Sequence, residues 1–83
     1  EIDIISRLAD TVYFSEVKAR KENSLVAIEE SITQDKKARL KRAALSYISQ
    51  NLKVQTEIGF LFIFIILKNN NIIKKIEVVA DSP

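Results

Sequence analysis

Polar and apolar positions alternate in two short segments at the start of the chain. Residues 2–7 and 11–19 are rich in isoleucine, valine and aromatic side chains with polar residues between them, a pattern that predicts β-strands. The stretch from Ser6 to Thr11 is short enough to serve as a hairpin loop. The sequence therefore predicts an antiparallel hairpin here, followed by a loop over residues 18–23 where the apolar periodicity is lost.

A helical period follows in the middle of the chain, whereas residues 24–30 fit either a short helical turn or an extension of that helix. Ser31 and Gln34 fit a capping box with Ser31 as the N-cap, and the helix is expected to run to about Asn51. One apolar stripe recurs at helical spacing, at Leu40, Ala43, Ala44, Tyr47 and Ile48. Lys36 lies on the same line one turn earlier, so we expect it near the sheet.

The most apolar stretch is Ile58 to Leu67, which is too short to cross a bilayer as a helix. Its β-branched and aromatic content predicts a strand buried on both faces, parallel to residues 11–19 because a helix lies between them. Residues 69–71 are asparagines that tolerate a turn, and residues 72–79 read as a final edge strand. These elements predict one α/β (α+β) domain over residues 1–83, with a mixed β-sheet flanked by a helix.

The amino-acid composition limits the kinds of catalytic and metal-binding site that the chain can form. The chain has no cysteine and no histidine, which excludes disulfides, Cys/His zinc sites, thiol nucleophiles and histidine acid–base catalysis. A metal would have to be a hard, oxygen-ligated cation such as Mg²⁺ or Mn²⁺. No segment has the pattern of a signal peptide, so a cytoplasmic location without a membrane association is the default expectation.

The basic residues are unevenly distributed. Eight of the thirteen fall between positions 18 and 42: Lys18, Arg20, Lys21, Lys36, Lys37, Arg39, Lys41 and Arg42. Such a run is consistent with a solvated helix face, and equally with a surface that binds phosphate backbones. We take Arg20, Lys36, Lys37 and Arg39 as candidate nucleic-acid contacts.

Asp3, Glu16 and Lys18 are the candidate reactive groups. Side chains two apart on a strand share a face, so Glu16 and Lys18 point the same way. If paired residue numbers in the hairpin add to 17, 19 or 21, Asp3, Glu16 and Lys18 share one face of the sheet. A sum of 19 places Asp3 opposite Glu16 and Glu1 opposite Lys18. Two carboxylates and a lysine at one spot are typical of a divalent-metal phosphodiesterase site, with Glu1 as an accessory group. The same spacing also fits exposed strand residues that merely form ion pairs.

Three segments of the sequence together carry a family resemblance. Glu1 to Ile5, followed by Tyr13 to Arg20, resembles the GEIDLI…FVEVKxR signature of the YraN-type bacterial family. Ser31 to Lys36 is similar to that family's AVTxxK segment. The family resembles archaeal Holliday-junction resolvases and belongs with the PD-(D/E)XK, restriction-endonuclease-like nucleases.

The resemblance implies a restriction-endonuclease-like fold and specific roles. Asp3 and Glu16 would bind the metal, Lys18 would be the catalytic lysine, and Lys36 would lie near the site and contact a DNA or RNA backbone, with DNA the favoured partner. Two alternatives stay open: a module that binds nucleic acid without cutting it, and a protein-interaction domain that offers its sheet edge.

In the family a helix and a strand precede the GEID motif, whereas this sequence starts at Glu1. An incomplete domain of this kind would expose an apolar face and an unpaired edge. We therefore expect a homo-oligomeric, aggregation-prone or partly folded chain with poor catalysis.

Overall fold

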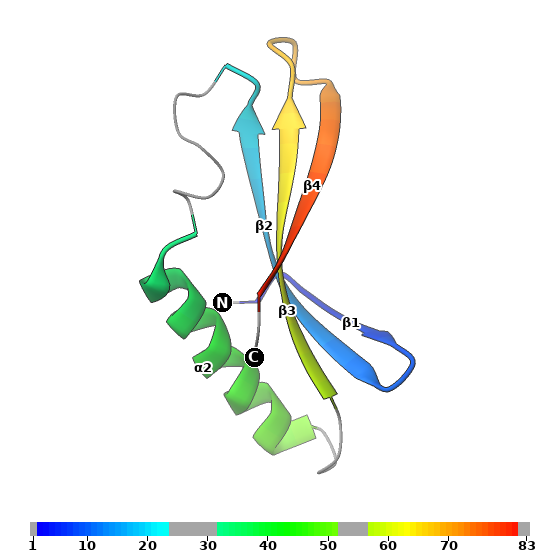
Figure 1. The fold of residues 1–83 in the computed structure, drawn as a ribbon, viewed down its shortest axis with the longest axis vertical. Helices are drawn as coiled ribbons and strands as arrows, with labels where there is room; N and C mark the ends of the chain where they lie inside the picture. The colour runs from blue at the N-terminus through cyan, green and yellow to red at the C-terminus, as the bar shows by residue number, and fades with distance from the viewer. Residues whose placement is uncertain (1, 24–31, 52–56, 82–83) are drawn as a thin grey trace.

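The computed structural model describes residues 2–23, 32–51 and 57–81, which form a mixed four-stranded sheet and a long helix (Figure 1). The elements in chain order are β1 (Ile4–Leu8), β2 (Thr11–Lys21), α2 (Gln34–Asn51), β3 (Glu57–Leu67) and β4 (Ile73–Asp81). The strands lie in the order β1-β2-β3-β4, with β2 and β3 parallel and the other neighbours antiparallel. This architecture confirms the predicted α+β class and the parallel pairing across the helix.

The hairpin adopts one of the three registers considered from the sequence and has a tighter loop than expected. Ile4 pairs with Ser15 and Leu8 with Thr11, so paired residue numbers add to 19. Pairing continues to Leu8, and the turn consists of Ala9 and Asp10, with Ala9 at a φ of 53°. The longer loop expected from Ser6 to Thr11 is therefore wrong, because the backbone hydrogen bonds of the ladder extend closer to the turn.

The loop expected over residues 18–23 is also largely wrong, because β2 continues to Lys21. Its parallel partner β3 runs beside it over its whole length, from Thr11 opposite Glu57 to Lys21 opposite Leu67. The Glu22 amide then donates to the Leu67 carbonyl at 2.7 Å. Pairing with β3 keeps these polar residues extended although their side chains show no apolar alternation.

Helix α2 is capped by a residue other than the predicted one. The Thr33 hydroxyl accepts a hydrogen bond from the Lys36 amide at 3.2 Å, and the Thr33 carbonyl accepts the Lys37 amide at 3.0 Å. This is the N-cap geometry, so the helix begins at Gln34. Ser31 and residues 24–30 lie outside the described residues. No helix in the described part of the chain is both long and apolar enough to cross a membrane.

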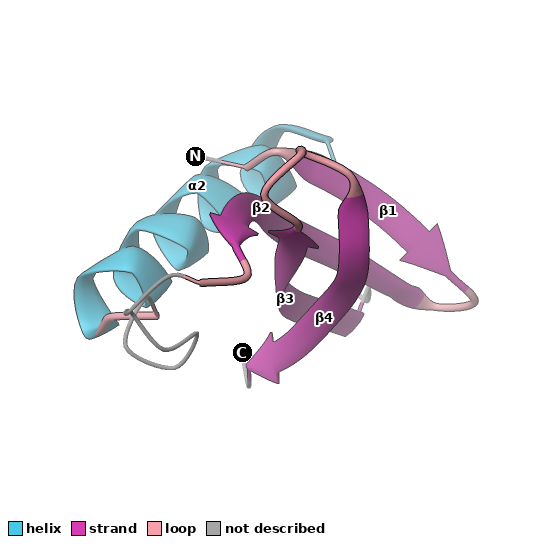
Figure 2. Ribbon diagram, turned by 90° about the horizontal axis from the view of Figure 1, so that it is seen from above, coloured by secondary structure: helices cyan, strands magenta, loops and turns pink. Residues whose placement is uncertain are grey.

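The core lies between α2 and one face of the sheet. Figure 2 shows α2 beside that face. Phe14 is fully buried and meets the Phe60 ring at 6.1 Å and the edge of the Tyr47 ring at 5.8 Å. Leu40 and Ala44 complete this contact from the helix, as the apolar stripe predicted. The remaining buried apolar residues are Val12, Phe62, Phe64 and Ile66.

On the opposite face of the sheet, the described side chains of β3 and β4 are less buried than those that face the helix. Along β3 the even-numbered residues from Phe60 to Ile66 are buried, whereas the odd-numbered ones are only half-buried. The expectation of a strand buried on both faces is therefore wrong, since no described helix covers the second face. On β4, Ile76 and Val78 lie on that face and are each 57% exposed. Asn71 adopts a φ of 65° in the turn before β4, as its residue type allows.

Candidate active site

Asp3 holds the edge of β2 next to Glu16. Its backbone amide donates to the Ser15 carbonyl at 2.9 Å, and its carboxylate oxygen Oδ2 accepts the Val17 amide at 2.8 Å. Regular pairing with β1 stops at Ile4, so beyond Ser15 the Asp3 carboxylate satisfies a β2 amide that β1 does not reach. These two bonds bracket Glu16 and fix the Asp3 carboxylate beside it.

Glu16 and Lys18 project from β2 on the side that carries α2. They follow Phe14 at two-residue intervals, and Phe14 packs against the helix. The Glu16 side chain is 17% exposed and that of Lys18 44% exposed, and Glu16 Oε2 lies 3.7 Å from Lys18 Nζ. Glu16 is thus the more enclosed member of this ion pair.

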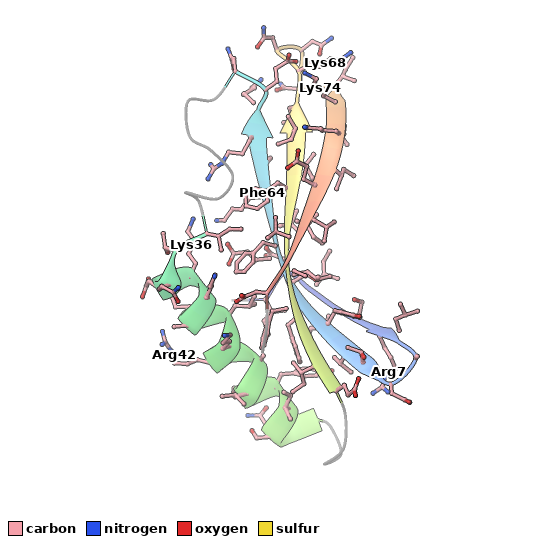
Figure 3. The ribbon with its side chains drawn as sticks, viewed as in Figure 1. Arg7, Lys36, Arg42, Phe64, Lys68 and Lys74 are labelled. Atoms are coloured by element: carbon pink, nitrogen blue, oxygen red, sulfur yellow. The ribbon has the colours of Figure 1, made fainter. Side chains whose placement is uncertain are left out.

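The N-terminal part of α2 supplies the other side of the site. Lys36 and Arg39 are three residues apart and so lie on one face of the helix. In Figure 3 Lys36 stands at the end of α2 that follows Thr33. Arg39 is also held by Asp35, with Nε 3.2 Å from Oδ2.

These groups surround a surface cavity of about 490 Å³. The described residues that line it are Asp3, Glu16, Val17, Lys18, Lys36 and Arg39. Two carboxylates therefore share one cavity with three cations. Such a cavity can hold a cation on its acidic side and an anionic group, such as a phosphate, on its basic side.

Other predicted contacts lie elsewhere. Lys37 points to the far end of β4, where its Nζ is 3.6 Å from Asp81 Oδ1. Arg20 lies on the Glu16 side of β2 but does not line the cavity. Glu1 is outside the described residues. Figure 3 shows Arg42 on the outer side of α2 and Arg7 near the hairpin turn, so the basic residues that the structure describes are spread over several parts of the surface.

The carboxylates can be tested as ligands for a hard metal ion. Among the residues that the structure describes, no group of three Asp, Glu, His or Cys side chains is arranged to hold a metal. Mg²⁺ requires only one or two protein carboxylates and keeps several waters, and Mn²⁺ accepts the same oxygen ligands. Asp3 and Glu16 fit that requirement.

The sequence analysis did not predict two features of the site. One is the hydrogen bond that Asp3 accepts from β2, and the other is that Lys36 lines the cavity whereas Lys37 contacts Asp81. The first depends on a side-chain to backbone bond with Val17 that no spacing reveals. The second was available from the helical period, which places Lys36 with Arg39 and Lys37 with Lys41. Lys41 Nζ indeed lies 3.9 Å from the same Asp81 carboxylate that Lys37 approaches.

Comparison with known sequences identifies the family. Residues 1–80 match the family described as "Uncharacterised protein family UPF0102". The chain belongs to this family. UPF0102 is the YraN-type family that the strand motifs around Asp3 and Glu16 resemble.

Relatives in the UPF0102 family come from several bacteria. The chain is 35% identical over 72 residues to a UPF0102 protein of Desulfosudis oleivorans, an alignment that covers 87% of this chain and 58% of that protein. It is 32% identical over 82 residues to one of Geotalea daltonii, covering 99% of the chain and 64% of the relative. The chain thus spans about three fifths of the length of these relatives. No solved structure matches it.

Proposed function

We propose that this UPF0102 chain carries the active site of a metal-dependent nuclease that hydrolyses phosphodiester bonds in structured or branched DNA. The observation that carries this proposal is the shared cavity, in which Asp3 and Glu16 face Lys18, Lys36 and Arg39. The likeness of the strand motifs to resolvase-type nucleases supports branched DNA as the substrate.

Each group has a chemical role in this proposal. Asp3 and Glu16 would hold Mg²⁺ or Mn²⁺, and such an ion would polarise the phosphate and lower the pKa of a bound water. Lys18 stabilises the negative charge that develops on the phosphate in the transition state. Lys36 and Arg39 hold the adjacent phosphate backbone, because both cations line the same cavity from the helix side.

Metal binding is the first test. Titration of Mn²⁺ or Mg²⁺ followed by calorimetry should show binding that Asp3→Asn and Glu16→Gln each weaken by at least about tenfold, since each removes one ligand charge. Asp10→Asn in the hairpin turn is the matched control, because it removes the same charge outside the cavity and should leave binding unchanged. Equal metal affinity in the Asp3→Asn and wild-type chains would refute the assignment.

Cleavage is the second test, with branched and duplex DNA as substrates. Lys18→Ala should lower the cleavage rate by about 100-fold or more while DNA affinity changes little, because its cation acts on the transition state. Lys21→Ala is the control on the same strand, since Lys21 bonds to Asn69 and Asn71 and does not line the cavity. Unchanged cleavage by Lys18→Ala would remove Lys18 from the mechanism.

A non-catalytic nucleic-acid-binding module is the second candidate. The observation that favours it is the ion pair between Glu16 and Lys18, which already satisfies one carboxylate without a metal. This module would bind DNA through Lys36 and Arg39 in the presence of a chelator and would never cut it. Cleavage that depends on added Mn²⁺ or Mg²⁺ separates the two candidates.

A further inference from the structure

The outer edge of β4 has no part in the nuclease site proposed above, because no described β4 residue lines the cavity. β4 lies at the end of the sheet and pairs only with β3 among the described strands. Such an edge presents backbone N–H and C=O groups at alternate residues, which can pair with another strand. The irregular step of β4 falls at its beginning, between the pairs Ile66–Lys75 and Leu67–Ile73, so residues 75–81 form a regular edge.

The two faces of this regular edge differ in character. On the open side of the sheet, Ile76, Val78 and Ala80 lie in a row beside Ile65, Ile63 and Leu61 of β3. All three β4 side chains on this side are apolar and exposed. The charged residues of the regular edge, Lys75, Glu77 and Asp81, lie on the helix side, where they stand beside Ile66, Phe64 and Phe60.

We propose that this edge binds a second copy of the same chain, through antiparallel pairing of β4 with β4 around a two-fold axis at Val78. The axis runs perpendicular to the sheet, so the two sheets join into one and both α2 helices lie on the same side. Each residue then faces a residue whose side chain points to the same side of the sheet, as antiparallel pairing requires.

Overlap and charge select this register. Centring on Val78 is the alignment in which all of residues 75–81 face their counterparts. It places Lys75 opposite Asp81 of the second copy, on the same side of the sheet, at both ends of the pair. Opposite charges at facing positions stabilise a strand pair.

The neighbouring registers oppose like charges. Centring the pair on Glu77 sets that carboxylate against its own copy, and centring it on Val79 sets Glu77 against Asp81. Like charges directly opposite each other destabilise a strand pair. Registers shifted further in either direction overlap only at the ends of the regular segment.

The apolar row also matches itself in the selected register. Val78 faces Val78 of the second copy, and Ile76 faces Ala80. Val78 and Ile76 are each 57% exposed in the single chain, so pairing removes apolar surface from water along the junction. Backbone bonds, end charges and the apolar row therefore all favour a second copy of this chain as the occupant.

Disulfide trapping tests the register directly, because the chain contains no cysteine. Facing residues in an antiparallel pair have Cα atoms about 4.5–5.5 Å apart, within the range that a disulfide spans. Val78→Cys should form a disulfide-linked dimer at least about tenfold faster than Leu45→Cys, a control residue on α2 that is 64% exposed. Equal rates for the two variants would overturn the proposal.

Sedimentation equilibrium of the 83-residue chain supplies a second test that needs no cross-link. The wild-type chain should be dimeric at tens of micromolar, and Val78→Lys should raise the dimer Kd by at least about tenfold because two lysines then face each other. Ile72→Lys is the control, since Ile72 is 58% exposed and precedes the paired segment. A monomeric wild-type chain, or a dimer indifferent to Val78→Lys, would overturn the proposal.

Discussion

At the scale of single residues, Asp3 combines an observed hydrogen bond with the metal-binding task proposed above, and the two tasks make different demands on its side chain. As a hydrogen-bond acceptor for the Val17 amide it needs only an oxygen atom at 2.8 Å. As a ligand in the proposed metal site beside Glu16, it would need its negative charge. The two tasks can therefore be separated by substitution, because asparagine keeps the oxygen and loses the charge.

Asp3→Asn should leave the free energy of unfolding within about 0.5 kcal/mol of wild type, since the amide oxygen still accepts from Val17. Asp3→Ala should lower it by about 1–2 kcal/mol, because the Val17 amide then loses its partner. Urea unfolding followed by circular dichroism measures both. Equal destabilisation by the two variants would mean that charge, and not the hydrogen bond, holds this edge.

Glu16 and Ser15 show how one strand separates chemistry from packing at adjacent positions. Ser15 is 1% exposed and lies between Ile4 of β1 and Leu61 of β3. Glu16 points to the other side, into the cavity, next to Lys18. The alternation of a strand thus places a small residue where two neighbours crowd it and a carboxylate where a cation can reach it.

At the scale of elements, the register of α2 divides its basic residues between two tasks. Lys36 and Arg39 line the cavity, whereas Lys37 and Lys41 approach Asp81 at the end of β4. Lys41 also lies over the Phe60 ring, with Nζ 5.8 Å from its centroid. The phosphate contacts proposed above therefore fall to the first pair, whereas the second pair links α2 to β4 through Asp81.

DNA affinity measured at several salt concentrations tests this division. Lys36→Gln and Arg39→Gln should each weaken binding and reduce the slope of log K against log salt by about one, because each removes one phosphate contact. Lys37→Gln is the matched control on the same helix and should leave the slope unchanged, since its partner is Asp81. A smaller slope for Lys37→Gln than for Lys36→Gln would reverse the assignment.

At the scale of the whole molecule, a single small core positions both sides of the cavity. Phe14 connects β2 to β3 through Phe60 and to α2 through Tyr47. The same strand carries Glu16 and Lys18, and the same helix carries Lys36. Because the core is small, the geometry of the site depends on the packing of a few aromatic rings.

Phe14→Ala should therefore cost about 3–5 kcal/mol, which is comparable with the total stability of about 5–10 kcal/mol expected for a domain of this length. We expect a thermal melt without a sharp cooperative transition for this variant. Leu45→Ala, at a position 64% exposed on α2, is the control and should change stability by less than about 0.5 kcal/mol. A cooperative Phe14→Ala melt near the wild-type midpoint would contradict this account of the core.

The exposed second face of the sheet and the outer edge of β4 are features of the whole molecule that bear on self-association. The expectation that the chain self-associates stays a prediction, and the pairing around Val78 gives it a specific form. Association through the β4 edge leaves the cavity accessible, because the cavity lies between β2 and the start of α2. A dimer of this kind is therefore compatible with the proposed nuclease site.

The amino-acid sequence by itself determined most of the local elements and placed Glu16 and Lys18 on one side of a strand. Alternation from Ile4 to Leu8 and from Thr11 onwards, the stripe from Leu40 to Ile48, and the asparagine turn each follow from contacts within a few residues. The sequence also reduced the hairpin register to three alternatives that include the observed one, because a short turn leaves few ways to pair two strands. Asp3 lies just before the paired residues, and its hydrogen bond from the Val17 amide fixes its place beside Glu16.

Only the tertiary structure decided the features that depend on partners distant in the chain. Pairing with β3 extended β2 through Lys21, against the local pattern. The Thr33 cap, the turning of Lys37 towards Asp81, and the half-open second face of β3 likewise depend on which surfaces meet. The spacing of residues along the sequence shows which side of a helix or strand each side chain occupies. Its burial and its hydrogen-bond partners depend on the segment packed against that side, which is usually far away in the sequence.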